Sequence, residues 1–257
     1  MRIGAQFFTL REQCRTLEGL REMLGRVREI GYETVQISGT CAYDPAWLRD
    51  TLAEFGLSCV LTHTDPGRMA EDPARVAGEH DVFHCKYVGI GMMPGALQGG
   101  RADYDRFVET YLPVARVMKE RGHLLMYHNH DMEFARTGNG NEIYLERMMK
   151  DFPEDLLGFT FDTYWAQHGG ADSAAWLRRL AGRIPCVHFK DMVYSLEDRA
   201  PRMAAVGSGN IGFEACVAAC QEGGTEYILV EQDNCYDRHP LDCLKDSYDY
   251  LHSLGLK

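Results

Sequence analysis

The sequence alternates short apolar segments with segments of helical periodicity along almost its whole length. Eight segments have the length and the apolar or β-branched content of buried strands: Ile3–Phe8, Thr34–Ile37, Ser58–Thr62, Tyr87–Ile90, Leu124–His128, Gly158–Phe161, Cys186–Phe189 and Ile228–Glu231. Strands that are each followed by a helix form βαβ units, in which the strands run parallel. Eight such units can close into a barrel.

The segments between these strands carry the periodicity and the end signals of helices. Apolar residues recur at i, i+3 and i+4 spacing over Leu17–Ile30 and Phe107–Met118. An Asp-Pro pair opens a further helix over residues 44–55, which Gly56 ends. Asp and Gly mark the two ends of another helix over residues 172–181 in the same way.

An open, doubly wound sheet is the competing architecture for such a pattern. Its first turn from strand to helix carries a Gly-x-Gly-x-x-Gly motif, whereas Ile3–Phe8 is followed by Thr9-Leu10-Arg11-Glu12. No low-complexity linker divides the chain, and about 250 residues suit one α/β barrel. We therefore predict a single (β/α)8 TIM barrel domain over residues 1–257.

Charge and cysteine content restrict the partners and the compartment that we expect. The chain has 38 acidic and 27 basic residues and a net charge of −11, which disfavours nucleic acid and anionic membrane surfaces as partners. No apolar run approaches a membrane span, and the first residues lack the apolar core of a signal peptide. Nine cysteines without a Cys-x-x-Cys motif suit a reducing compartment. We expect a cytoplasmic protein.

Polar and ionisable residues cluster where four consecutive predicted strands end, which is where (β/α)8 barrels place their active sites. Acids and imidazoles together form a mixed nitrogen and oxygen set that suits Mn²⁺, Co²⁺, Mg²⁺ or Zn²⁺ in a catalytic site. Such residues also occur as helix caps or as buried, hydrogen-bonded histidines. Their recurrence at neighbouring strand ends favours one shared site, and the candidates are His128, His130, Glu133, Asp162, Trp165, His188, Lys190 and Glu231.

Three further features are open to two interpretations. His63 could reach the same mouth of the barrel or be a turn residue, and Trp165 could stack on a sugar ring or pack in the protein. Residues 207–212, Gly-Ser-Gly-Asn-Ile-Gly, are similar to a phosphate-cradling loop but lack a neighbouring Lys or Arg. We expect this loop to be a flexible lid.

Several of these segments together match a known superfamily. They are residues 127–134 (Tyr-His-Asn-His-Asp-Met-Glu-Phe), 158–162, 187–191, 206–211 and 230–233. In this order they resemble the xylose isomerase-like TIM-barrel superfamily, in its sugar phosphate isomerase/epimerase branch. The resemblance implies one divalent ion, commonly Mn²⁺ or Co²⁺, held by Glu, Asp, His and Glu from strands five to eight. The last three of these ligands would be Asp162, His188 and Glu231.

The fifth strand departs from the epimerase pattern, because His128 stands where those enzymes place the glutamate and Glu133 follows five residues later. The His-Asn-His-Asp-x-Glu-Phe form resembles members implicated in inositol and 3-keto-sugar breakdown by a lyase or dehydratase step. Three carboxylates and one imidazole would suit Mn²⁺ or Mg²⁺. We therefore predict Glu133 as the fourth ligand, with His128 as the alternative ligand or a catalytic residue.

The chemistry common to these relatives is removal of a proton next to a carbonyl through an enediolate. We predict Glu231 and Glu133 as base and acid and Lys190 as a proton donor, with His63, His130, Trp165 and Lys190 binding substrate. With few cations besides Lys190 at the strand ends, we expect an unphosphorylated sugar.

The expected function is a metal-dependent isomerase or epimerase of a ketose or keto-sugar. The alternative is a lyase or dehydratase acting on a 3-keto-glycoside or keto-inositol, and an endonuclease-like or noncatalytic sugar-binding protein is less favoured. Barrels of this kind often pair, so a homo-oligomer is compatible with the resemblance.

Overall fold

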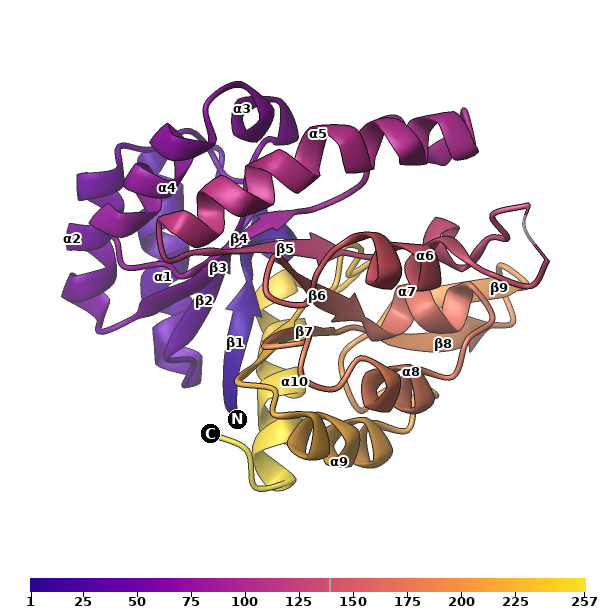
Figure 1. The fold of residues 1–257 in the computed structure, drawn as a ribbon. Coiled ribbons are helices and arrows are strands. Elements are labelled where there is room, and N and C mark those ends of the chain that lie inside the picture. Colours follow the sequence, from indigo (N-terminus) through magenta and orange to yellow (C-terminus); the bar gives the residue numbers. More distant parts are fainter. Residues whose placement is uncertain (139) are drawn as a thin grey trace.

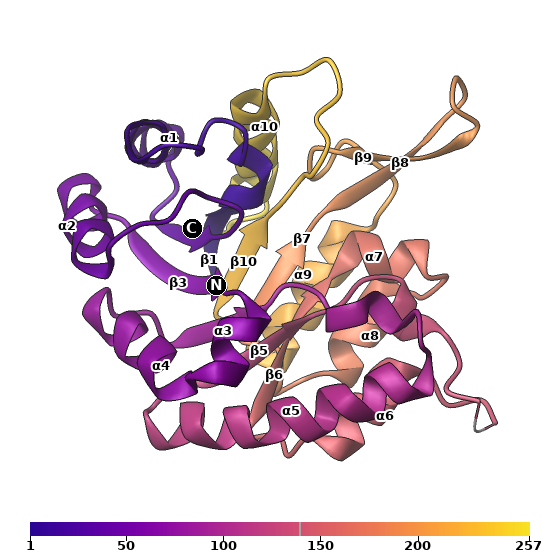
Figure 2. The same ribbon diagram turned by 90° about the horizontal axis from the view of Figure 1, so that it is seen from above.

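The computed structural model, which describes residues 1–138 and 140–257, is built around eight parallel strands that close into a barrel (Figures 1 and 2). Around the barrel the order is β1-β10-β7-β6-β5-β4-β3-β2. The strands are β1 (Arg2–Gln6), β2 (Thr34–Ile37), β3 (Ser58–His63), β4 (Tyr87–Ile90), β5 (Leu124–His128), β6 (Leu157–Asp162), β7 (Cys186–Phe189) and β10 (Tyr227–Val230). This topology confirms the predicted (β/α)8 barrel.

Helices connect the strands and surround the barrel (Figure 2). They are α1 (Leu17–Ile30), α2 (Pro45–Phe55), α3 (Pro66–Glu71), α4 (Pro73–Val82), α5 (Arg101–Glu120), α6 (Tyr144–Asp151), α7 (Thr163–His168), α8 (Ser173–Arg179), α9 (Phe213–Gly223) and α10 (Pro240–Ser253), with short 3-10 turns η1 (Phe7–Leu10), η2 (Pro94–Leu97) and η3 (Met132–Phe134). Among the described residues, no helix combines the length and apolarity that a membrane span requires.

Helix α2 illustrates how the end signals act. The Asp44 side chain accepts hydrogen bonds from the backbone amides of Ala46 and Trp47, at 2.9 and 3.2 Å. Gly56 ends the helix in the left-handed conformation with φ 64°, which glycine adopts without a steric penalty. The predicted bounds of this helix are confirmed.

Two parts of the chain differ from the predicted elements. The first strand ends at Gln6 rather than Phe8, because the Gln6 side chain accepts a hydrogen bond from the Phe8 amide and starts a 3-10 turn. After β7 the chain forms an antiparallel hairpin, β8 (Asp191–Ser195) and β9 (Ala200–Ala204), which projects beyond the barrel (Figure 2).

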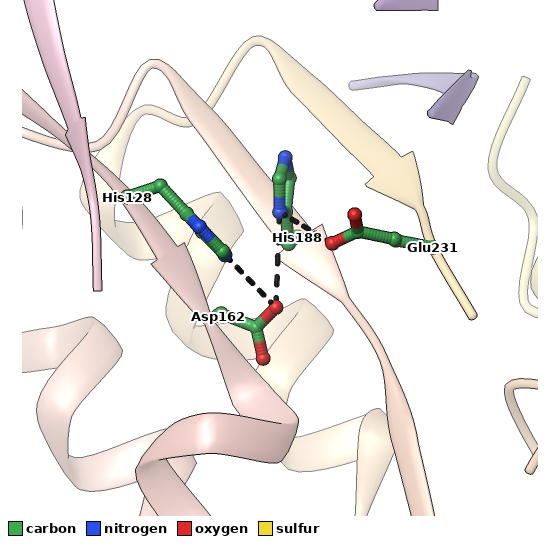
Figure 3. Close-up of side chains that lie close together, drawn as sticks. All are labelled: His128, Asp162, His188 and Glu231. Atoms are coloured by element: carbon green, nitrogen blue, oxygen red, sulfur yellow. Dashed lines mark hydrogen bonds and ion pairs between the residues drawn. The ribbon is translucent and has the colours of Figure 1, made fainter. Parts of the chain in front are cut away.

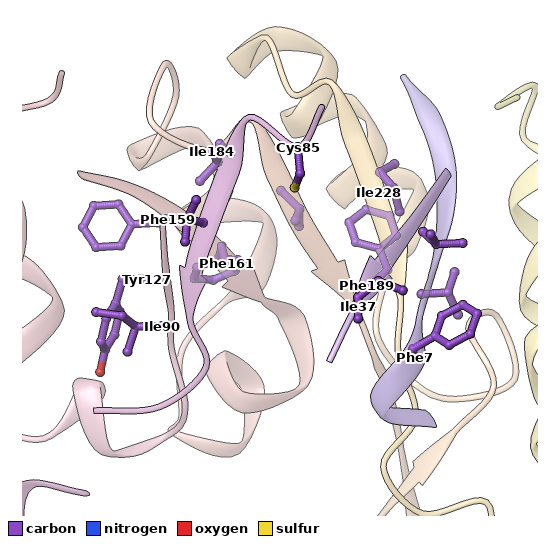
Figure 4. Packing of buried hydrophobic residues seen from close by; sticks show 14 of the residues in the cluster. Phe7, Ile37, Cys85, Ile90, Tyr127, Phe159, Phe161, Ile184, Phe189 and Ile228 are labelled. Carbon is purple, nitrogen blue, oxygen red and sulfur yellow. The ribbon is translucent and has the colours of Figure 1, made fainter. Parts of the chain in front are cut away.

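Alternation along the strands separates an outer apolar layer from inward-facing residues, which are apolar lower in the barrel (Leu61, Met126 and Leu229) and polar at the strand ends. Tyr127, Phe159, Phe161 and Phe189 are buried in the core between the strands and the helices (Figure 4). Because successive side chains in a strand point to opposite faces, the residues next to these aromatics point into the barrel. The packing of the outer layer therefore aims the polar residues of the strand ends at one another.

Candidate active site

Four buried side chains from neighbouring strand ends meet at the mouth of the barrel (Figure 3). His128 ends β5, Asp162 ends β6, His188 lies in β7 and Glu231 follows β10. One potential ligand atom from each residue lies within 4.8 Å of the others. This four-residue cluster could hold a metal ion.

One ring nitrogen of each imidazole in the cluster bonds a group outside the cluster, and the other nitrogen faces the cluster. His128 Nδ1 lies 2.8 Å from the Gly91 carbonyl oxygen and donates to it, which leaves Nε2 facing Asp162 Oδ2 at 3.1 Å. His188 Nε2 lies 2.6 Å from Gln36 Oε1, which leaves Nδ1 facing Glu231 Oε2 at 3.0 Å. A histidine held in this way by a second partner has a fixed tautomer and a lone pair available for a metal.

The two carboxylates are also held by outside groups, so that one oxygen of each is left for the cluster. Gln6 Nε2 donates to Glu231 Oε1 at 2.6 Å, and the Trp165 amide donates to Asp162 Oδ1 at 2.9 Å. Asn129 Oδ1 accepts from the Asp162 amide at 2.9 Å and holds the strand end. The remaining oxygens, Asp162 Oδ2 and Glu231 Oε2, face the imidazoles.

This arrangement fits a divalent cation. His188 Nδ1 is buried without a hydrogen-bond partner and faces Glu231 Oε2 at 3.0 Å, an oxygen that also lies 2.9 Å from Lys190 Nζ. Two lone pairs pointed at each other repel, whereas a cation placed between them makes both into ligands. His128 Nε2 and Asp162 Oδ2 lie in hydrogen-bond contact at 3.1 Å, and a cation could take the place of that contact.

Lys190 adds an ammonium group beside the cluster. Its Nζ lies 2.9 Å from Glu231 Oε2, 3.3 Å from Asp162 Oδ2 and 3.0 Å from Asp233 Oδ1. Three carboxylates against one ammonium leave two uncompensated negative charges in a buried site. A divalent ion would balance them, and buried charge is tolerated only when it is paired.

The pKa shifts follow from these contacts. Burial opposes ionisation of Asp162 and Glu231, but the Lys190 ammonium and the neighbouring imidazoles hold the pKa of both carboxyls below their ordinary values. Burial also opposes the charge of Lys190, yet Asp162, Glu231 and Asp233 raise the pKa of its ammonium. At neutral pH the site therefore contains a protonated Lys190 beside ionised carboxylates.

Glu133 does not join the cluster. Its side chain is fully buried and accepts hydrogen bonds from the Tyr127 hydroxyl, at 2.5 Å, and from the His130 amide, at 2.7 Å. Tyr127 points to the outer face of β5, so η3 carries Glu133 behind the barrel wall rather than into its mouth. In this structure Glu133 does not take the predicted ligand position, and His128 is the strand-five member of the cluster.

The buried position of Glu133 predicts a pH effect on stability. Burial raises the pKa of Glu133 to about 7, although hydrogen bonds from Tyr127 and His130 act in the opposite direction. Because the folded pKa exceeds the unfolded value of 4.5, this group stabilises the fold at low pH and loses that contribution as the pH rises through about 7. The free energy of unfolding of the wild type should therefore fall relative to that of Glu133→Gln between pH 4 and 8. This relative change should be at most about 3 kcal/mol.

Urea unfolding at several pH values measures this effect. Glu22→Gln, on the exposed side of α1, is the matched control and should show a constant difference from the wild type. A constant difference for Glu133→Gln as well would refute the buried, titrating carboxyl.

A cavity of about 830 Å³, here called the mouth cavity, opens above the cluster. Its polar lining includes His63, His130, Lys190, Glu231 and Asp233, and its apolar lining includes Phe8, Met92 and Met93. Lys190 is the one Lys or Arg among the described lining residues, and its charge is already paired. The mouth cavity therefore suits a neutral, polar ligand better than a phosphorylated one.

Two predicted substrate-binding histidines line this cavity with free ring nitrogens. His63 Nδ1 lies 3.2 Å from Ser38 Oγ, while His63 Nε2 and His130 Nδ1 are buried without a partner. The His63 ring packs against Gly91, where an added Cβ would lie 2.9 Å from Nδ1. Both histidines line the mouth cavity, and their role in substrate binding stays a prediction.

Trp165 is placed differently from the prediction, because it is not among the residues that line the mouth cavity. Its ring lies 5.0 Å from the His130 ring, between centroids, and 5.5 Å from Lys190 Nζ. Trp165 therefore supports His130 and Lys190 from behind rather than stacking directly on a ligand.

Sequence reasoning missed three residues of the site, namely Asp233, Gln6 and Gln36. Asp233 follows Glu231 by two positions, so strand alternation places both on the same side. Gln6 ends β1, and Gln36 lies in β2 next to it. For Gln6 and Gln36, a polar residue within an otherwise apolar strand was the signal that could have predicted a place in the site.

The glycine-rich loop at residues 207–211 is neither a free lid nor a phosphate site. The Asp191 carboxylate accepts hydrogen bonds from the amides of Gly207, Gly209 and Ile211, at 3.0, 2.7 and 3.2 Å. Clustered backbone amides of this kind bind anions, and here the protein supplies the anion itself. The expectation of a flexible lid is corrected, because the loop is anchored.

Comparison with known proteins agrees with this fold. A family model described as xylose isomerase-like TIM barrel matches residues 24–254. An inosose dehydratase of Geobacillus kaustophilus is 23% identical over 91% of this chain and 86% of the relative. A solved sugar phosphate isomerase/epimerase from Parabacteroides distasonis has a TM-score of 0.82 and 21% identity, covering 98% of this chain and 93% of that one. A solved L-ribulose 3-epimerase has a TM-score of 0.74 and 18% identity, covering 99% and 94%.

Proposed function

Because this chain belongs to the xylose isomerase-like TIM barrel family, we propose that it is a divalent-metal-dependent enzyme that eliminates water or an alcohol from a neutral keto-sugar or keto-polyol. The observation that supports elimination most directly is the contact between the Glu231 carboxylate, a candidate base, and the Lys190 ammonium, a candidate acid. Glu231 Oε2 and Lys190 Nζ lie 2.9 Å apart on the same side of the mouth cavity.

The metal would be held by His128, Asp162, His188 and Glu231. Bound there, it would supply positive charge that stabilises the oxygen anion formed next to the reacting carbon. Two imidazoles with two carboxylates are a softer set than three carboxylates with one imidazole. We therefore propose Mn²⁺, Co²⁺ or Zn²⁺ rather than Mg²⁺, and Mn²⁺ is the ion used in the tests below.

The protein's own groups balance the proton transfers of an elimination. Because Glu231 Oε2 would be a metal ligand, the proton from the carbon next to the carbonyl goes to the lone pair of Oε1 that Gln6 does not occupy, and the C–H electrons form the enediolate. As the C=C bond forms, the bond from the β-carbon to its oxygen breaks, and the leaving oxygen takes a proton from Lys190. The proton on Glu231 then passes to Lys190, whose Nζ lies 2.9 Å from Oε2 of the same carboxylate, which restores both groups.

The contacts of Lys190 hold its ammonium beside the candidate base, so its proposed role as the acid rests on position and not on its pKa, which the same carboxylates raise. Asp233 Oδ1 and Oδ2 lie 3.0 and 3.1 Å from Nζ, so a second carboxylate contacts the ammonium besides Glu231. Epimerisation needs a second proton-transferring group on the other face of the substrate, and Glu133, the carboxylate predicted for that role, is instead hydrogen-bonded to Tyr127 and His130. Elimination needs only one base and an adjacent acid.

Epimerisation or isomerisation is the second candidate. His63 Nε2 and His130 Nδ1 are buried without partners in residues that line the mouth cavity, so either could return a proton to the substrate from another direction. The solved relatives that carry this activity in their names share the fold.

Product analysis in D₂O distinguishes the two reactions. With Mn²⁺ and a panel of keto-inositols and 3-keto-glucosides, we expect an unsaturated product that is lighter than the substrate by one water or one alcohol. An epimerase or isomerase would instead give a product of unchanged mass apart from deuterium on carbon. Protein treated with a chelator is the control, and elimination that continues at the full rate without metal would contradict the proposal.

A further inference from the structure

A second cavity, here called the side cavity, lies beside the mouth cavity and has a volume of about 620 Å³. The loop between β2 and α2 forms one wall, and α4 forms another. Residues that line only the side cavity include Thr40, Tyr43, Arg75, Glu79 and Phe83. None of them belongs to the four-residue cluster.

The two cavities share part of their walls. Ser38, Gly39, His63, Thr64 and Asp65 line both. Gly39 has no side chain at this shared edge, and an added Cβ would lie 2.6 Å from the Phe8 ring. Each cavity has a size that buries a small ligand, so one ligand of two units could occupy both across the shared edge.

The lining of the side cavity offers hydrogen-bond donors and acceptors next to each other. Arg68 donates to both oxygens of Glu79, at 2.9 and 2.7 Å, and Arg75 donates to the same carboxylate at 3.3 Å. Alternating guanidinium and carboxylate groups bind hydroxyl groups, which both donate and accept. Tyr43 and Phe83 add apolar ring surface against which the carbon face of a sugar can pack.

The charge of the lining argues against an anionic ligand. Both arginines share Glu79, and Asp44 and Asp65 add two further carboxylates to the wall. A phosphate or a sugar acid would therefore meet more negative than positive charge here. The side cavity suits a neutral, hydroxyl-rich group.

We propose that the side cavity binds the second, uncharged sugar unit of a substrate whose keto-sugar ring lies in the mouth cavity. The substrate class is then a keto-disaccharide or a similar glycoside rather than a free monosaccharide. This assignment rests on the proposed function for the reacting ring, whereas binding of the second unit is tested separately.

A variant that fills the side cavity tests the kinetic consequence. Ala42 lines this cavity and lies outside the mouth cavity, so Ala42→Trp narrows it without touching the cluster. We expect the wild type to prefer a 3-keto-disaccharide over the methyl 3-keto-glucoside by about tenfold or more in kcat/KM. Ala42→Trp should remove this preference with little change for the methyl glycoside. Ala70→Trp, exposed on α3, is the matched control and should keep it.

Saturation-transfer NMR with unreactive cellobiose tests binding without turnover. In the wild type both sugar rings should receive saturation, and in Ala42→Trp only one ring should do so. If neither keto-substrate reacts, the proposed function fails. The NMR comparison then still tests whether the side cavity binds a sugar unit. Saturation of a single ring in the wild type, or an identical pattern in Ala42→Trp, would overturn the inference.

Discussion

Replacement of Asp162 by Asn is expected to abolish turnover and to weaken Mn²⁺ binding by at least about a hundredfold. The variant removes one of the two carboxylate charges of the cluster, whose Oδ2 lies 3.1 Å from His128 Nε2. Asn can still accept the Trp165 amide through Oδ1, as Asp162 does at 2.9 Å. The start of α7 should therefore be preserved, and the loss should be specific to the metal centre.

Asp172→Asn is the matched control for this variant. Asp172 caps α8 through Oδ1, which accepts from the Ala175 amide at 2.8 Å, and it has no part in the cluster. Calorimetric titration with Mn²⁺ and turnover of the same preparations should separate the two variants. Wild-type metal affinity in Asp162→Asn would contradict the assignment of the ligands.

Replacement of Lys190 by Met is expected to lower kcat by about 10² to 10⁴ while the metal remains bound. Lys190 Nζ contacts Asp162, Glu231 and Asp233, so its removal leaves three buried carboxylates without their cation. The metal-free variant should therefore melt at a lower temperature than the metal-free wild type, and Mn²⁺ should stabilise the variant more strongly than the wild type.

Lys245→Met serves as the control, because Lys245 pairs with Asp249 on the exposed face of α10 and lies outside the cluster. Steady-state kinetics at saturating Mn²⁺ and scanning calorimetry with and without the ion give the two readouts. Unchanged kcat in Lys190→Met would exclude Lys190 as the proton donor.

The barrel and three members of the cluster could be predicted from the sequence, and the reason is geometrical. Parallel strands of a closed barrel all end at one mouth, so Asp162, His188 and Glu231 at consecutive strand ends had to converge. Strand alternation then decided which side chains point inward. These relationships depend only on the order and period of the residues.

The same geometry indicated the fourth member, His128, which ends β5 and was kept as the alternative ligand, but Glu133 was preferred on charge, and the position of Glu133 depends on a local turn. The charge argument favoured Glu133, but η3 returns the chain to the outer face of β5, where the Tyr127 hydroxyl and the His130 amide bind that carboxylate. No residue pattern distinguishes this turn from one that points inward. The same is true of Gln36 and Gln6, whose contacts with His188 and Glu231 join residues far apart in the sequence.

Anomalous diffraction from crystals soaked in Mn²⁺ tests the metal centre most directly. We predict one strong peak per chain, located among His128, Asp162, His188 and Glu231. Crystals of Asp172→Asn should show the same peak and crystals of Asp162→Asn should not. The absence of a peak at this position in the wild type, or a peak at the Glu133 carboxylate instead, would contradict the proposed centre.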